Sequence, residues 1–155
     1  MSPAPSGAAV DPSLLDVLPS SIAGLDFIYQ PDASAQAAAD LSPGQGTLSI
    51  AYAVAGDPDG GDLVVAAVTR PSPRAFGDDF FRSWRDTFDE SACEPAGGIS
   101  GHAEAQIGGR TVFIGTCEAG LTIYHAYLAR RALVVSVTSF GAGRLGEQLM
   151  GALRD

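Results

Sequence analysis

The sequence predicts an α+β fold in which a central, mainly antiparallel sheet has helices packed on both faces. The first observation is a β-hairpin signal, because two β-rich segments, residues 47–55 and 62–69, flank an Asp-Pro-Asp-Gly-Gly turn. The second is a run of four strand-like segments joined by short turns, at residues 100–107, 110–117, 121–128 and 132–139. The third is a pair of amphipathic segments with helical spacing, at residues 72–90 and 144–153. A sheet of about six or seven strands between these two helices would bury the apolar side of each element.

The chain before the hairpin is expected to form three short elements. A helix is predicted at residues 11–18, because an Asp-Pro pair supplies an N-cap and a proline for the first helical position. Residues 25–30 alternate apolar and polar side chains, as a strand does. Residues 32–40 are rich in alanine and begin with Asp32, which predicts a capped helix followed by a Pro/Gly loop at 42–46.

The helix predicted at residues 72–90 carries an aromatic stripe. Ser72-Pro73 is a typical helix start. Four aromatic side chains then recur at every fourth residue, with Phe81 beside them: Phe76, Phe80, Trp84 and Phe88. Next to a predicted sheet, such a stripe favours a core contact over a stacking platform for a sugar or a base.

The short turns between the last four strands fix a provisional register. One row across the sheet then contains Glu104, Phe113, His125 and Ser136. The face that carries this row is half apolar, so we expect a helix to cover it. Cys117 lies an even number of positions from Phe113 in the same predicted strand, so its side chain is expected on the same face.

The composition favours one globular domain at residues 11–155 that follows a flexible tether at residues 1–10. The net charge of −9 disfavours nucleic acid and anionic membranes as partners, because an acidic surface repels phosphate. No apolar run is long enough to span a bilayer. The tether is typical of a segment that follows a removed signal peptide or a lipid-anchor cysteine, so one of these two is expected in the full-length precursor, and a lipid anchor is one of the alternatives.

Of the two cysteines, Cys93 follows a predicted helix and Cys117 ends a predicted strand. A lone pair of cysteines in different elements favours a disulfide over two buried free thiols. A disulfide indicates an oxidising compartment, so we expect an extracytoplasmic location, either secreted or membrane-anchored.

The candidate ligand-binding residues are His102, Glu104, His125 and Ser136. Ser136 next to His125 is compatible with a hydrolase, but Glu104 is expected two strands, about 10 Å, from His125, too far for a catalytic triad. His125 is also too far from His102 and Glu104 to share a zinc ion with them. We therefore assign no catalytic, cofactor-binding or metal-binding residue.

A cluster of acidic residues lies in the hairpin turn. Asp57, Asp59 and Asp62 could bind calcium weakly, but their spacing does not match an EF-hand, and a simple turn explains them.

Turn and core motifs in the second half of the chain resemble uncharacterised secreted or lipoprotein-type domains of high-GC bacteria. The motifs are Phe80-Phe81-Arg82-x-Trp84-Arg85, Cys93, Gly101-His102-Ala103-Glu104, Gly108-Gly109-Arg110-Thr111-Val112, Gly115-Thr116-Cys117 and Tyr124-His125. The order of elements is also distantly similar to the PsbP/Mog1-like sandwich. The resemblance implies a helix–sheet–helix architecture and export, and it transfers no catalytic residue.

Together these observations lead us to expect a non-enzymatic extracytoplasmic module, lipoprotein-like, that binds a partner protein or a small ligand. Two alternatives stay open. A small-ligand carrier would need a cavity between the sheet and a helix. A hydrolase-type enzyme would use polar residues near His125, in hydrogen-bond contact with Ser136 below an open cleft.

Overall fold

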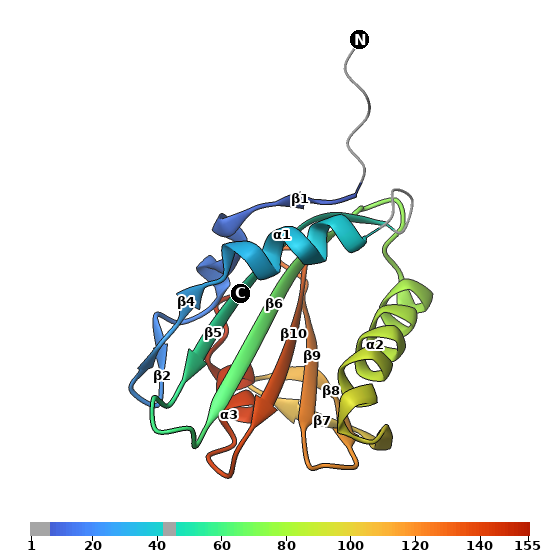
Figure 1. Cartoon of the computed structure of the whole chain (residues 1–155). Coiled ribbons are helices and arrows are strands. Elements are labelled where there is room, and N and C mark those ends of the chain that lie inside the picture. The colour runs from blue at the N-terminus through green and yellow to red at the C-terminus, as the bar shows by residue number, and fades with distance from the viewer. Residues whose placement is uncertain (1–6, 42–45) are drawn as a thin grey trace.

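A computed structural model describes residues 7–41 and 46–155 of the chain (Figure 1). Within these residues, eight strands form one sheet, and seven of them follow the order β1-β5-β6-β10-β9-β8-β7. The eighth strand, β4, also pairs with β5, at Ala53 and Val54, whereas β1 pairs at Ser49 and Ile50. Every pairing is antiparallel except β1 with β5. The strand bounds are β1 Ala9–Val10, β4 Ile28–Tyr29, β5 Thr47–Gly56, β6 Leu63–Pro71, β7 Ile99–Ile107, β8 Arg110–Cys117, β9 Thr122–Leu128 and β10 Leu133–Phe140. The expected large, mainly antiparallel sheet is thus confirmed.

The helices of the described residues are α1, α2 and α3, with the 3-10 helices η1 and η2. Their bounds are η1 Pro12–Val17, α1 Pro31–Asp40, α2 Asp78–Cys93, η2 Glu94–Ala96 and α3 Leu145–Ala152. In Figure 1, α1 and α2 lie over the same side of the sheet, with α1 at β5 and α2 at the β7–β8 end. α3 packs on β9 and β10.

The predicted register is confirmed at every position of the row. Glu104 pairs with Phe113, Phe113 with His125, and His125 with Ser136. In the hairpin, the backbone of Asp57 bonds to that of Asp62 at 2.8 Å across the predicted turn. Short turns leave the flanking strands only one pairing, so local sequence is enough to determine it.

The start of α2 differs from the prediction. The helix begins at Asp78 rather than at Ser72, because the extended backbone of Gly77 (φ 179°) interrupts it. Residues 72–76 form a separate turn in which the Phe76 amide donates to the Ser72 carbonyl at 3.0 Å. Phe76 leaves the helix but still stacks on Tyr127 at 4.2 Å between ring centroids.

Two further boundaries also differ. The strand expected at 25–30 is split into β3 (Leu25–Asp26), which forms a small hairpin with β2 (Ser21–Ile22), and β4, which joins the large sheet. Asp32 does not cap α1: the helix starts at Pro31, and its N-cap, Gln30, makes no side-chain capping bond. Asp32 lies in the first turn, where a carboxylate is still favourable.

The large sheet includes two residues of the segment 1–10, which we expected to be a flexible tether. β1 pairs with β5, so Ala9 and Val10 belong to the sheet. Residues 1–6 of the expected tether, and residues 42–45 of the expected loop, lie outside the described residues. Among the described helices, none is both long and apolar enough to cross a membrane.

The disulfide is present between Cys93 and Cys117, with an S–S distance of 2.01 Å. It joins the last residue of α2 to the last residue of β8, and both cysteines are at most 1 % exposed. Closing a loop of this length stabilises the fold by about 3 kcal/mol in the chain-entropy picture. The bond therefore holds the C-terminal end of α2 against the sheet.

Candidate functional site

A buried chain of polar side chains connects α2 to the middle of the sheet. His125 in β9 is fully buried, and its two ring nitrogens are both engaged. Nδ1 lies 2.8 Å from the Oγ atom of Ser136 in β10, and Nε2 lies 2.6 Å from the Oδ1 atom of Asp89 in α2. Ser136 is fully buried and Asp89 is 2 % exposed, so the whole array is shielded from water.

Trp84 extends this chain by one further link. Its Nε1–H donates to the Oγ atom of Ser136 at 3.0 Å. Ser136 can then donate its hydroxyl proton to Nδ1 of a neutral His125, whose Nε2–H donates to Asp89. Each of the three hydrogen bonds then has one proton, so all three can form with a neutral imidazole.

The sequence makes room for this contact. Asp89 lies one helical turn before Cys93, so the disulfide turns it toward the sheet. Opposite it in β8 stands Gly115, and a Cβ atom there would be 2.6 Å from the Oδ2 atom of Asp89. The ring of Phe88 meets that of His125 edge-on at 5.3 Å. Gly115 thus leaves space for the Asp89 carboxylate, and the ring of Phe88 covers one side of His125.

The array has the residue types of a serine hydrolase, but its geometry does not support that chemistry. In a catalytic triad, His binds serine through Nε2 and the acid through Nδ1, whereas His125 does the reverse. Ser136 lies inside a central strand with no exposed surface, and its oxygen already accepts a bond from Trp84. A substrate carbonyl has no access to it. The array instead fastens α2 to the sheet.

Sequence reasoning brought His125 and Ser136 together correctly but missed the acid. Glu104 is across from Phe113, as expected, and makes no ion pair among the described residues. The acid is Asp89, which comes from the helix above the sheet. Its spacing of four residues from Cys93 was the one signal that could have revealed it.

His102 and Glu104 line a second feature, a surface hollow of about 340 Å³ beside α2. The Nε2 atom of His102 is 3.6 Å from the Oδ2 atom of Asp89, and its side chain is 56 % exposed. Arg85 also lines the hollow, with its guanidinium carbon 3.7 Å from the ring centroid of Phe113. Burial lowers the pKa of Arg85, and the nearby carboxylate of Asp86 partly opposes that shift. Acidic and basic groups are mixed here, so the hollow has no clear charge preference.

The described residues contain no group of three or more His, Cys, Asp or Glu side chains arranged to hold a metal ion. His125 has no free ring nitrogen for a metal. In the hairpin turn, Asp57 accepts the amide of Asp59 at 2.8 Å, and Asp62 accepts the amide of Gly143 at 2.8 Å. These carboxylates are used by the backbone of the turn and by the loop before α3.

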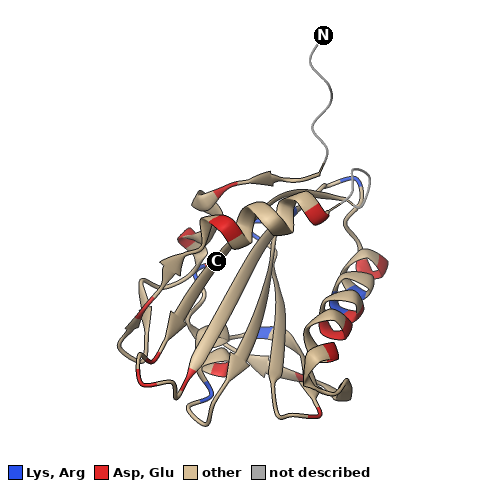
Figure 2. Cartoon of the chain, viewed as in Figure 1, with Lys and Arg blue, Asp and Glu red and all other residues tan. Residues whose placement is uncertain are grey.

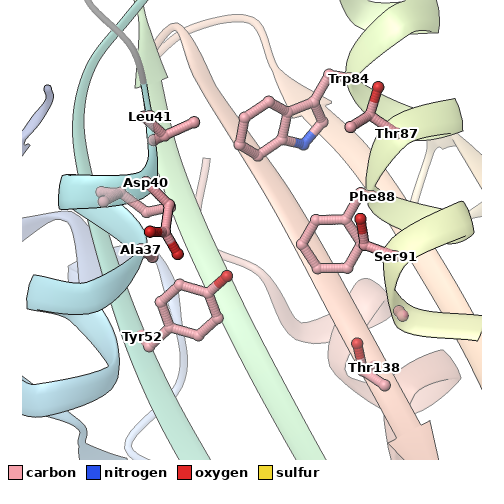
Figure 3. Close-up of a pocket in the computed structure, with 11 residues that line it drawn as sticks. Ala37, Asp40, Leu41, Tyr52, Trp84, Thr87, Phe88, Ser91 and Thr138 are labelled. Atoms are coloured by element: carbon pink, nitrogen blue, oxygen red, sulfur yellow. The ribbon is translucent and has the colours of Figure 1, made fainter. Parts of the chain in front are cut away.

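A groove of about 570 Å³ lies between α1 and α2 (Figure 3). We call it the α1–α2 groove, and its main apolar and aromatic lining residues are Leu41, Ile50, Tyr52, Trp84, Phe88 and Ala92. The sheet contributes its floor through β5 and through Thr138 of β10. In Figure 3 the rings of Trp84 and Phe88 project from α2 toward α1, while Tyr52 rises from β5 with its hydroxyl in the space between the helices.

The buried array and the groove share the residues of α2. The polar edge of Trp84 bonds to Ser136, so the apolar part of the indole is left for the groove. Phe88 likewise touches His125 on one side and lines the groove on the other. The array therefore fixes the aromatic wall of the groove.

No protein-family model matches this chain, and searches of the curated proteins and of the solved structures found no match either.

Proposed function

We propose that this protein is an extracytoplasmic binding module that holds a small, mainly apolar ligand in the α1–α2 groove. The observation that carries the proposal is the groove itself. Its volume of about 570 Å³ falls in the range of small-molecule sites, and aromatic and aliphatic side chains line most of it. A few polar groups, among them Thr87, Ser91 and Thr138, stand at its edge and floor, as in sites that orient a ligand.

The fixed position of the aromatic wall supports the same proposal. Trp84 is held by its bond to Ser136, and α2 is held by Asp89 and by the disulfide. Side chains that are already ordered lose little entropy when a ligand binds, which raises affinity. The array thus acts as a support for binding rather than as a catalytic centre.

The extracytoplasmic location is part of the proposal. The disulfide supports it, because such bonds persist in oxidising compartments. We also propose a relationship to secreted domains of high-GC bacteria and, more distantly, to the PsbP/Mog1-like sandwich, on the basis of the sequence motifs given above.

We also infer that helices cover both faces of the sheet. Tyr124 and His125 are neighbours in β9 and so point to opposite faces. His125 bonds to α2, whereas a Cβ at Gly146 of α3 would lie 2.6 Å from the ring of Tyr124. Buried residues of α3 belong to the cluster that includes Tyr124, which fits a second covered face.

Binding of an uncharged hydrophobic fluorophore, N-phenyl-1-naphthylamine, tests the proposal. Trp84 is the single tryptophan of the chain, so its emission reports on the groove directly. We expect saturable binding that quenches Trp84. Substitution Ala37→Phe, which fills the groove from α1, should weaken binding at least tenfold.

The matched control is Ala35→Phe, which adds the same ring to α1 at an exposed position that does not line the groove. It should leave the affinity unchanged. Absence of saturable binding, or equal affinity in the two variants, would overturn the proposal.

A further inference from the structure

The charge on the described lining of the α1–α2 groove is negative. Among the described residues that line it, Asp40 is the one charged side chain, and none is Lys, Arg or His. The arginines of α2 nearest to the groove, Arg82 and Arg85, line the hollow on the other side of the helix instead. Figure 2 shows acidic residues on both α1 and α2, and basic residues on α2 but not on α1.

The backbone adds to this negative field. α1 ends at Asp40 with Leu41 as its C-cap, and both residues line the groove. A helix C-terminus carries partial negative charge on its last carbonyl groups, and α1 has no basic residue in its last turn to neutralise it. One end of the groove therefore combines a carboxylate with a helix C-terminus.

The aromatic side chains at the same site suit a cation as well. The faces of Trp, Tyr and Phe rings attract cationic groups, and Trp84, Phe88 and Tyr52 all border the groove. Figure 3 places the Asp40 carboxylate on the α1 side of the groove, across from the α2 rings. Burial raises the pKa of Tyr52, so this hydroxyl stays neutral at physiological pH.

From this arrangement we infer that the ligand of the α1–α2 groove is an organic cation, an amine or quaternary ammonium group attached to an apolar body. The apolar body fits between the aromatic wall of α2 and the side chains of Ile50 and Leu41. The cationic group lies at the Asp40 end. Fatty acids and other organic anions of the same size are disfavoured, because no lining group among the described residues would neutralise them.

The inference rests on the proposed ligand-binding function, so its test uses three compounds that share a phenylalkyl body and carry a positive, a neutral or a negative head group. They are 4-phenylbutylamine, 4-phenyl-1-butanol and 4-phenylbutanoate, measured by isothermal titration calorimetry at low ionic strength, where screening is weak. We expect the amine to bind at least threefold more tightly than the alcohol. The acid should bind at least threefold more weakly than the alcohol.

Two charge variants of α1 identify the source of the preference. Asp40→Asn should bring the amine within about twofold of the alcohol, since one exposed carboxylate changes affinity by about fivefold at most. Asp32→Asn removes the same charge from the first turn of the same helix, away from the groove, and should leave the preference intact.

The outcomes separate this inference from the function on which it rests. If the alcohol binds and the amine binds no more tightly, or if the acid binds as well as the amine, the ligand is not a cation but the groove still binds. An Asp32→Asn effect equal to that of Asp40→Asn would also overturn the inference. If none of the three compounds binds although N-phenyl-1-naphthylamine does, the inference fails while the small-ligand function stands. If N-phenyl-1-naphthylamine does not bind either, both fail.

Discussion

Gly115→Ala is the sharpest perturbation of the buried array, because it acts on Asp89 without removing any polar atom. The added Cβ would lie 2.6 Å from Oδ2 and 2.9 Å from Cγ of Asp89. Ordinary contact begins near 3.4 Å, so the carboxylate must retreat by about 0.8 Å. A shift of that size along the bond to His125 would lengthen it from 2.6 Å to about 3.4 Å, beyond hydrogen-bond range.

The cost follows from the burial of the pair. Breaking the hydrogen bond between a buried carboxylate and a buried imidazole lowers the free energy of unfolding by about 2–4 kcal/mol. For a domain of this size, that corresponds to a fall in melting temperature of about 4–16 °C. Urea unfolding followed by Trp84 fluorescence, together with calorimetry, measures both quantities.

The control is Gly101→Ala in the neighbouring strand β7, where an added Cβ meets no atom within 4 Å. We expect its effect to stay within about 0.5 kcal/mol. In an Asp89→Ala background, Gly115→Ala should change the free energy of unfolding little, because the carboxylate that it would clash with is absent. The difference between the effects of Gly115→Ala in the two backgrounds is the coupling energy of this contact. Equal stability of the Gly115→Ala and Gly101→Ala proteins would refute our description of the array.

Three further outcomes are expected. Ser136→Ala leaves the Trp84 Nε1–H and the His125 Nδ1 atom without a partner, so unfolding should become easier by about 1–3 kcal/mol; unchanged urea and emission curves would contradict the bond. Replacing Cys93 and Cys117 together with alanine should lower stability by about 3 kcal/mol, measured by the same curves, and a protein as stable as the parent would argue against the disulfide. Burial raises the pKa of Tyr52 above 10.0, so the contribution of the neutral phenol to stability is complete below pH 10 and is lost as the pH rises through the folded-state pKa. Tyr52→Phe should reduce this loss of stability at alkaline pH and remove a late step from the phenolate absorbance titration. An unaltered titration would contradict the burial of Tyr52.

The parts of the fold that sequence could predict are those with local causes. The turns between residues 107 and 133 determine the pairing of β7 to β10, so the neighbours of His125 within the sheet were predicted correctly. The disulfide was predictable because only two cysteines are present. In contrast, the start of α2 was wrong, since the extended conformation of Gly77 overrides the Ser-Pro signal five residues earlier.

The candidate site was only half predictable, because it depends on how α2 docks onto the sheet. Asp89 meets His125 across a sequence separation of 36 residues, with Gly115 leaving the space for the carboxylate. No local pattern determines such a contact. The α1–α2 groove depends on how α1 and α2 are placed relative to each other, and no sequence pattern indicates that placement. The aromatic stripe was therefore interpreted as part of the core alone. Trp84 and Phe88 are in fact shared between the core array and the groove.

The most direct measurement of ligand binding is a map of backbone and indole NMR shifts during titration with N-phenyl-1-naphthylamine. We predict that the shifts concentrate at the Trp84 indole N–H, Tyr52 and Thr138, which border the groove from α2, β5 and β10. Shifts that cluster instead around His102 and Glu104 in the other hollow, or that spread evenly over the molecule, would contradict the groove as the ligand site.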